Sequence, residues 1–141
     1  MKTSKLLFYG IIFCLIVNLM NCSTNDTVID SNNKIIGTWT LNSQRINGSE
    51  TINSCTRQTN FVFEASGILR KNFYTLNNGS CQYQGEDIFS WSINGTDIYR
   101  ISNASGSSNL LQFTFSNNDS SFEITETDGN NNSIVSFFNK N

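Results

Sequence analysis

The chain has 141 residues with a formal net charge of −2, a length that provides one small domain with a modest hydrophobic core. It contains no histidine, which excludes Ser-His-Asp and Cys-His catalysis and histidine-based metal sites. Its acidic balance, with no basic cluster beyond Arg70-Lys71, argues against nucleic acid as a partner.

The N-terminal segment is basic and then apolar. Lys2 and Lys5 precede an apolar run of 15 residues, Leu6–Met20, and Cys22 follows this run closely. Such a run is shorter than the roughly 20 residues that a membrane-spanning helix needs. The segment, which ends in Leu-Met-Asn-Cys, resembles a bacterial lipoprotein signal peptide with its lipobox. The resemblance implies that residues 1–21 are cleaved and that Cys22 is acylated and becomes the mature N-terminus.

An acylated Cys22 would make the lipid bilayer a partner of this protein. We therefore expect a lipid-anchored protein of the bacterial cell envelope, at the outer membrane, facing either the periplasm or the cell surface. The alternative is an ordinary secretory signal cut near Asn21, which would leave a soluble protein. In both cases Lys2 and Lys5 are lost, so the mature chain is two charges more negative than the −2 of the full sequence.

The rest of the chain divides into a tether and a folded domain. Residues 22–33 are mainly Ser, Thr, Asn and Asp, a composition that predicts a flexible tether. Residues 34–141 then form the domain, in which Cys55 and Cys81 are the only cysteines. In an oxidising compartment we expect these two cysteines to form a disulfide. Two free thiols are the alternative.

The domain has the sequence pattern of antiparallel β-strands. Apolar residues recur at every second position in eight short segments, at residues 39–41, 61–63, 69–73, 89–93, 99–101, 111–115, 122–124 and 135–137. A period of two predicts half-buried strands, and Asn-Gly and Asp-Gly pairs between them favour tight hairpins. We predict an all-β fold, an eight-stranded antiparallel up-and-down barrel that removes its exposed edges by closing. A two-sheet β-sandwich is the alternative.

Several motifs occur in an order typical of one known family. Gly37-Thr38-Trp39 lies on the first predicted strand, Cys55 precedes Phe61-Val62-Phe63-x-x-x-Gly67, and Cys81 precedes Trp91. This order resembles the small lipocalin-like domain of bacterial outer-membrane lipoproteins, over about Lys34 to Asn139. The resemblance implies a compact eight-stranded barrel, a Cys55–Cys81 disulfide, and a ligand-binding or interaction role. Lipocalins pack the opening Trp against an Arg near the last strand, where this chain offers only Lys140.

Three basic residues could point into the barrel. Arg70 and Lys71 are adjacent on one predicted strand, so alternation sends them to opposite faces, and Lys71 shares its face with Leu69. Arg45 has the same parity as Trp39. Arg45, Arg70 and Lys71 are therefore the candidate ligand-binding residues, for the anionic head group of an amphiphile. An edge strand or a β-bulge is the other account of these charges.

We interpret the domain as a non-catalytic binding module. Glu86-Asp87 and the pair Glu123 and Glu126 are interpreted as solvated surface charge rather than as catalytic acid and base, and no cofactor or metal is expected. The predicted ligand is a small apolar or amphipathic molecule inside the barrel. The alternative is a protein-interaction module at the envelope, such as an inhibitor of a host hydrolase. A cavity above about 300 Å³ would favour a ligand, whereas an interior filled by aromatic side chains would favour a protein partner.

Overall fold

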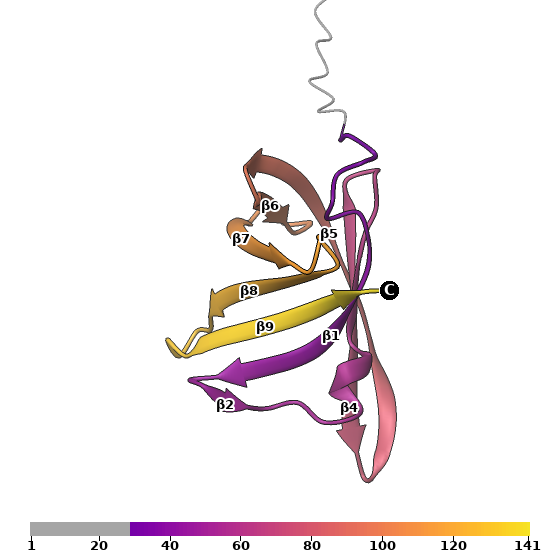
Figure 1. The fold of residues 1–141 in the computed structure, drawn as a ribbon. Coiled ribbons are helices and arrows are strands. Elements are labelled where there is room, and N and C mark those ends of the chain that lie inside the picture. The colour runs from indigo at the N-terminus through magenta and orange to yellow at the C-terminus, as the bar shows by residue number, and fades with distance from the viewer. Residues whose placement is uncertain (1–28) are drawn as a thin grey trace, which may run out of the picture.

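The structure is a computed structural model that describes residues 29–141. The predicted signal peptide and the predicted acylation site Cys22 lie outside these residues. The described part contains nine strands and one 3-10 helix (Figure 1): β1 (Gly37–Ile46), β2 (Ser49–Glu50), η1 (Thr56–Gln58), β3 (Asn60–Phe63), β4 (Ile68–Asn77), β5 (Ser80–Gly95), β6 (Ile98–Ser102), β7 (Ser108–Ser116), β8 (Ser121–Thr127) and β9 (Ser133–Lys140). Within residues 29–141, no helix is long and apolar enough to cross a membrane.

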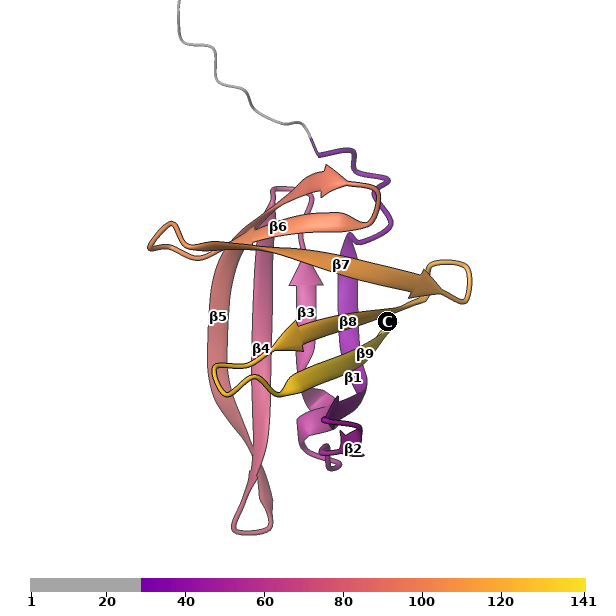
Figure 2. The same cartoon turned by 90° about the vertical axis from the view of Figure 1, so that its left-hand side faces the viewer.

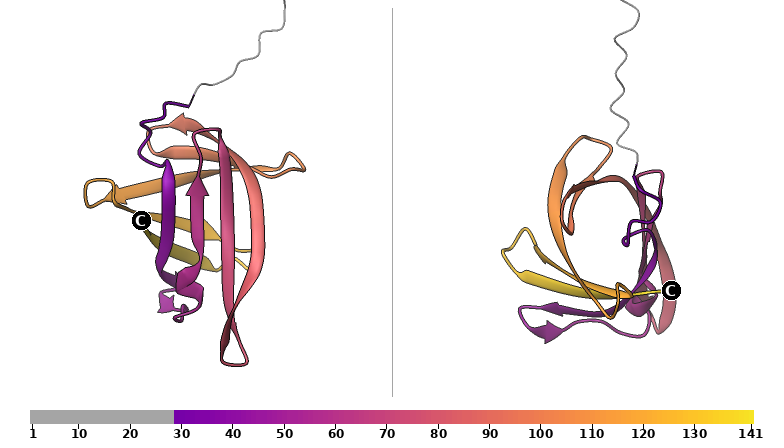
Figure 3. Two further views of the ribbon diagram at one scale, coloured as in Figure 1. Left: turned by 90° about the vertical axis from the view of Figure 1, so that its right-hand side faces the viewer. Right: turned by 45° about the horizontal axis from the view of Figure 1, so that its top comes forward.

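The strands form a closed antiparallel barrel. From β3 to β9 each strand pairs with the next along the chain, β3 also pairs with β1, and β1 pairs with β9 to close the ring. The two-residue strand β2 only extends the end of β1. The ring is visible when the molecule is viewed toward one end (Figure 3, right), and Figure 2 shows β8 and β9 crossing in front of β1. The up-and-down barrel is thus confirmed, and the sandwich is not adopted.

Each of the eight predicted segments lies in a strand, but an irregularity in β1 changes which of its side chains point inward. A β-bulge between Leu41 and Ser43 reverses the alternation along the rest of that strand. Ile93 on β5 is exposed, although Tyr99, its partner on β6, is buried. On β9 the buried side chains are Ser136 and Phe138, so the pattern at 135–137 located the strand but not its inner face.

The end of the barrel at which the described chain starts is closed by one cluster of contacts. Trp39 is fully buried, and its indole Nε1 donates a hydrogen bond to the Ile35 carbonyl at 2.6 Å. The Lys140 ammonium lies 5.0 Å from the Trp39 ring centre and donates a hydrogen bond to the Lys34 carbonyl at 2.9 Å. Gly37 has a φ of +134°, and a Cβ there would lie 2.9 Å from the Lys140 side chain. Lys140 therefore covers Trp39, and only glycine at position 37 leaves room for it.

The other end of the barrel is tied by the disulfide. Cys55 and Cys81 are bonded, which confirms the pairing predicted from the sequence. Cys55 is buried just before η1, whereas Cys81 lies near the start of β5, in the long β4–β5 hairpin that extends beyond the barrel (Figure 2). The bond thus joins the η1 segment to this hairpin and fixes the barrel wall on that side.

We predict that Cys55→Ser, Cys81→Ser and the double variant lower the free energy of unfolding by similar amounts, about 2 to 5 kcal/mol. The cause is the loss of a cross-link between residues 26 apart in sequence, which restricts the unfolded chain. Urea unfolding of oxidised protein measures the change. If the double variant lost the sum of the stabilities lost by the two single variants, the loss would not come from one shared disulfide.

Candidate functional site

The barrel interior is filled in one half and hollow in the other. Around Trp39 the space is occupied by aromatic rings in edge or stacked contact, those of Phe63, Trp91, Tyr99, Phe113, Phe115 and Phe122. Toward η1 the interior holds a cavity of about 350 Å³. Its apolar lining comes from β1, β3, β4, β8 and β9, from the residues Leu41, Phe61, Phe73, Tyr74, Ile124 and Phe138.

Four polar side chains add hydrogen-bonding groups to the wall of this main cavity. Thr56 is the first residue of η1, and Thr59 follows the last. Gln44 lies on β1 and Ser136 on β9. The Gln44 amide donates a hydrogen bond to the Ser136 hydroxyl at 3.1 Å. The wall therefore combines aromatic and aliphatic side chains with hydroxyl, amide and charged groups in similar measure, and the polar groups can orient a ligand.

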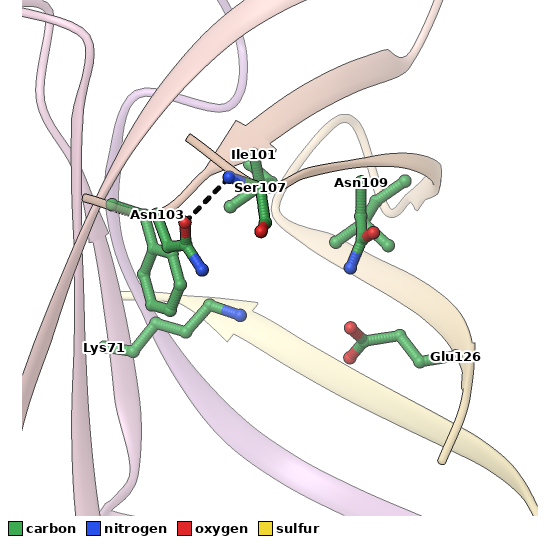
Figure 4. A pocket seen from close by; sticks show the side chains of 8 residues that line it. Lys71, Ile101, Asn103, Ser107, Asn109 and Glu126 are labelled. Carbon is green, nitrogen blue, oxygen red and sulfur yellow. Dashed lines mark hydrogen bonds between the residues drawn. The ribbon is translucent and has the colours of Figure 1, made fainter. Parts of the chain in front are cut away.

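A second cavity, of about 110 Å³, adjoins the main one. Asn103, Ser107 and Asn109, from the end of β6 to the start of β7, line it together with apolar groups of β5, β6 and β7. Lys71 and Glu126 line both cavities. We call the smaller cavity the polar recess; Figure 4 shows Lys71 and Glu126 pointing toward one another across it.

Lys71 points into the barrel because it shares the inner face of β4 with the buried Leu69. Its ammonium lies 4.8 Å and 5.0 Å from the ring centres of Phe61 and Phe89. Burial lowers the pKa of Lys71 below its usual value, and the nearby carboxylates of Glu126 and Asp87 offset part of this effect. The structure thus places a partly desolvated cation on an aromatic wall.

Glu126 corrects one interpretation made from the sequence. The sequence alone indicates solvated surface charge at this position. The side chain instead lies partly buried on the inner face of β8, the face that also carries Phe122 and Ile124. Its neighbour Glu123 is exposed, as expected. The strand alternation through Phe122 and Ile124 was the signal that could have identified Glu126.

The other two candidate cations lie on the outer surface. The Arg70 guanidinium makes ion pairs with Glu64 at 2.7 Å and with Glu86 at 2.9 Å. The Arg45 side chain is 62% exposed and lies 3.7 Å from Glu50, because the β1 bulge turns it outward and puts Gln44 on the inner side. Lys71 is therefore the one candidate cation that the structure places at the cavity.

The rest of the described chain offers little metal chemistry. Residues 29–141 contain no group of three or more Asp, Glu, His or Cys side chains arranged to hold a metal ion. Asp128, which begins a loop with some likeness to a calcium site, uses its carboxylate within the β8–β9 turn, where it accepts hydrogen bonds from the backbone N–H groups of Asn130 and Asn132. The cavity, with Lys71 and Glu126, is thus the candidate site.

Comparison with protein families gives a match to part of the chain. The model of a family described as a lipocalin-like domain matches residues 35–119, which include strands β1 to β7. This match confirms the resemblance seen in Gly37-Thr38-Trp39 and the motifs that follow it. No curated protein matches the chain.

We predict that the pKa of Lys71 lies below the usual value for a lysine, and that Glu126→Gln lowers this pKa further. Burial disfavours the charged form, and the variant removes a carboxylate that stabilises it. Titration of ¹³C-dimethylated lysines followed by NMR measures both values, with exposed Glu123→Gln as the matched control. An unchanged Lys71 pKa in Glu126→Gln would show that the two charges do not interact.

Proposed function

The chain belongs to the lipocalin-like domain family, and on that basis we propose that it binds a small amphipathic molecule inside the barrel, without catalysis. We further propose that it does so as a lipid-anchored protein of the bacterial cell envelope, at the outer membrane.

The observation that carries the binding proposal is the cavity. Its volume of about 350 Å³ lies at the lower end of the range of about 300 to 1,000 Å³ found for small-molecule sites. This volume suits a ligand with one short apolar chain better than a lipid with two long chains. The wall supports an amphipathic ligand, because aromatic and aliphatic side chains lie beside hydroxyl, amide and charged groups.

The proposed anchor agrees with the position of the cavity. Ile29, the first described residue, lies close to Gly67 in the β3–β4 turn, at the closed end of the barrel. The described chain therefore starts on the side where Lys140 covers Trp39, and the cavity lies toward the opposite end. Attachment to a membrane is compatible with ligand entry from the aqueous side.

We predict that N-phenyl-1-naphthylamine, a neutral apolar probe, binds one-to-one at micromolar concentration, and that Ser136→Phe weakens binding about tenfold or more. Ser136 is buried on the cavity wall, so a phenyl ring there would occupy part of the space. Probe fluorescence gives the affinities, and Ser133→Phe, at an exposed position of the same strand, is the control. Thermal unfolding checks that both variants fold.

Loss of affinity in both variants, or in neither, would contradict the cavity as the binding site. Absence of probe binding to the natural protein would remove the ligand-carrier proposal. A protein partner would then be the better assignment, at the large apolar side chains exposed on β4, β5 and β7: Leu76, Tyr83, Ile88, Ile93 and Leu110.

We predict that intact-mass analysis of the membrane fraction finds a chain that starts at Cys22 and carries acyl chains. Cys22→Ser should move the protein to the soluble fraction or leave it as an unprocessed precursor, because a single thioether-linked lipid is the proposed anchor. Cys81→Ser is the control, since it also replaces a cysteine by serine but leaves the proposed lipid site intact, and it should stay in the membrane. A mature, membrane-bound Cys22→Ser protein would contradict the anchor.

A further inference from the structure

Within residues 29–141, Lys71 and Glu126 are partly buried charged side chains with no ion-pair or hydrogen-bond partner, whereas the charged side chains that also lack one, Arg57, Asp87 and Glu123, are exposed to solvent. In residues 29–141 the ion pairs join Lys34 to Asp97 and Asp119, Arg45 to Glu50, and Arg70 to Glu64 and Glu86. Neither Lys71 nor Glu126 makes an ion pair or a side-chain hydrogen bond within this part of the chain, although their charged ends face one another across the polar recess (Figure 4).

Their position makes this arrangement costly without a ligand. Both side chains are partly buried and line the same two cavities, so each charge has lost part of its hydration. Charges removed from water are normally paired or hydrogen-bonded. Lys71 and Glu126 come from β4 and β8, which are not neighbours in the barrel, so the gap between them is a space that a third group can fill.

The charges inside the cavity balance one another. Asp87 pairs with Lys71 in the β4–β5 ladder, but it is exposed and lines neither cavity. Asp87 therefore acts on Lys71 from outside the cavities, and the charges that line the cavities are one positive and one negative. A ligand with a single negative charge would gain from Lys71 and be opposed by Glu126, whereas a ligand with both charges would satisfy both residues.

The neighbouring groups give the ligand a direction. The polar recess adds amide and hydroxyl groups from Asn103, Ser107 and Asn109, whereas the larger apolar surface lies in the main cavity, on Leu41, Phe61, Phe73, Tyr74, Ile124 and Phe138. A polar head therefore fits between Lys71 and Glu126, and an apolar chain extends from it into the main cavity.

We propose that the site selects a zwitterionic amphiphile, in which an anionic group lies against Lys71, an ammonium group lies against Glu126, and a single apolar chain fills the main cavity. This inference rests on the proposed ligand-binding function and names the chemical class of the ligand. It distinguishes the site from a carrier of simple fatty acids, whose carboxylate would have no counterpart for Glu126.

Three probes with nearly the same chain test the proposal. They are 2-aminodecanoic acid, which carries both charges, decanoic acid, which lacks the ammonium, and nonylamine, which lacks the carboxylate. Isothermal titration calorimetry at pH 7 should show that 2-aminodecanoic acid binds about tenfold or more tightly than either singly charged probe, because only this probe pairs both residues. Equal affinities for 2-aminodecanoic acid and decanoic acid would overturn the proposal.

Two variants assign the charges. Glu126→Gln removes the carboxylate that opposes an anion, so it should tighten decanoic acid binding about tenfold and bring its affinity close to that of 2-aminodecanoic acid. Lys71→Met removes the cation that opposes an amine, so it should tighten nonylamine binding by a similar factor. Glu123→Gln, on the outer face of β8, is the control and should leave all three affinities unchanged. Variants that change all three probes equally would show a structural rather than a charge-specific role and would overturn the assignment.

The experiments distinguish failure of the zwitterion proposal from failure of the ligand-binding proposal. If N-phenyl-1-naphthylamine binds but none of the three charged probes does, or if the probes bind without preference, the zwitterion proposal fails and the apolar cavity remains a ligand site. If no probe of either kind binds, both proposals fail.

Discussion

The pairing of β1 with β9 is the constraint on which the rest of the structure depends. It joins the first and last long strands of the sheet over the registers Trp39–Lys140 to Ile46–Ile134. Closure satisfies the backbone groups of both edges and creates an inner face that is shielded from water. The same pairing places Lys140 beside Trp39, so the contact that covers one end of the barrel is a direct result of the register that closes it.

An eight-stranded barrel is barely wide enough to be filled by its own side chains, and this protein divides that limited space. Large rings packed around Trp39 and Phe113 fill the half near the closed end. In the other half, smaller side chains such as Thr59 and Ser136 line the wall and a cavity remains. The disulfide holds η1 and the β4–β5 hairpin together near this hollow half, where packing contributes less.

Two charges on opposite walls determine the chemical character of the cavity. Lys71 lies against the rings of Phe61 and Phe89, an arrangement that stabilises a cation without neutralising it. Glu126 faces it from β8. Arg70, one residue away from Lys71, is instead neutralised by two carboxylates on the outer surface. Strand alternation thus gives the two adjacent cations different roles. Arg70 stabilises the outer surface of the wall through its ion pairs, and Lys71 is available to a ligand inside the barrel.

The sequence by itself determined the all-β class, the position of the eight long strands, the Cys55–Cys81 pair and the importance of Gly37 and Trp39, because alternation, turn residues and cysteine count are local properties. Only the tertiary structure decided which cations face inward. The bulge after Leu41 reverses the alternation and turns Arg45 outward, an effect that depends on pairing with β9. Lys71 and Glu126 are 55 positions apart in the chain, and barrel closure brings them to the same cavity. The size of the space between them depends on how the aromatic rings pack. No local sequence pattern encodes either property.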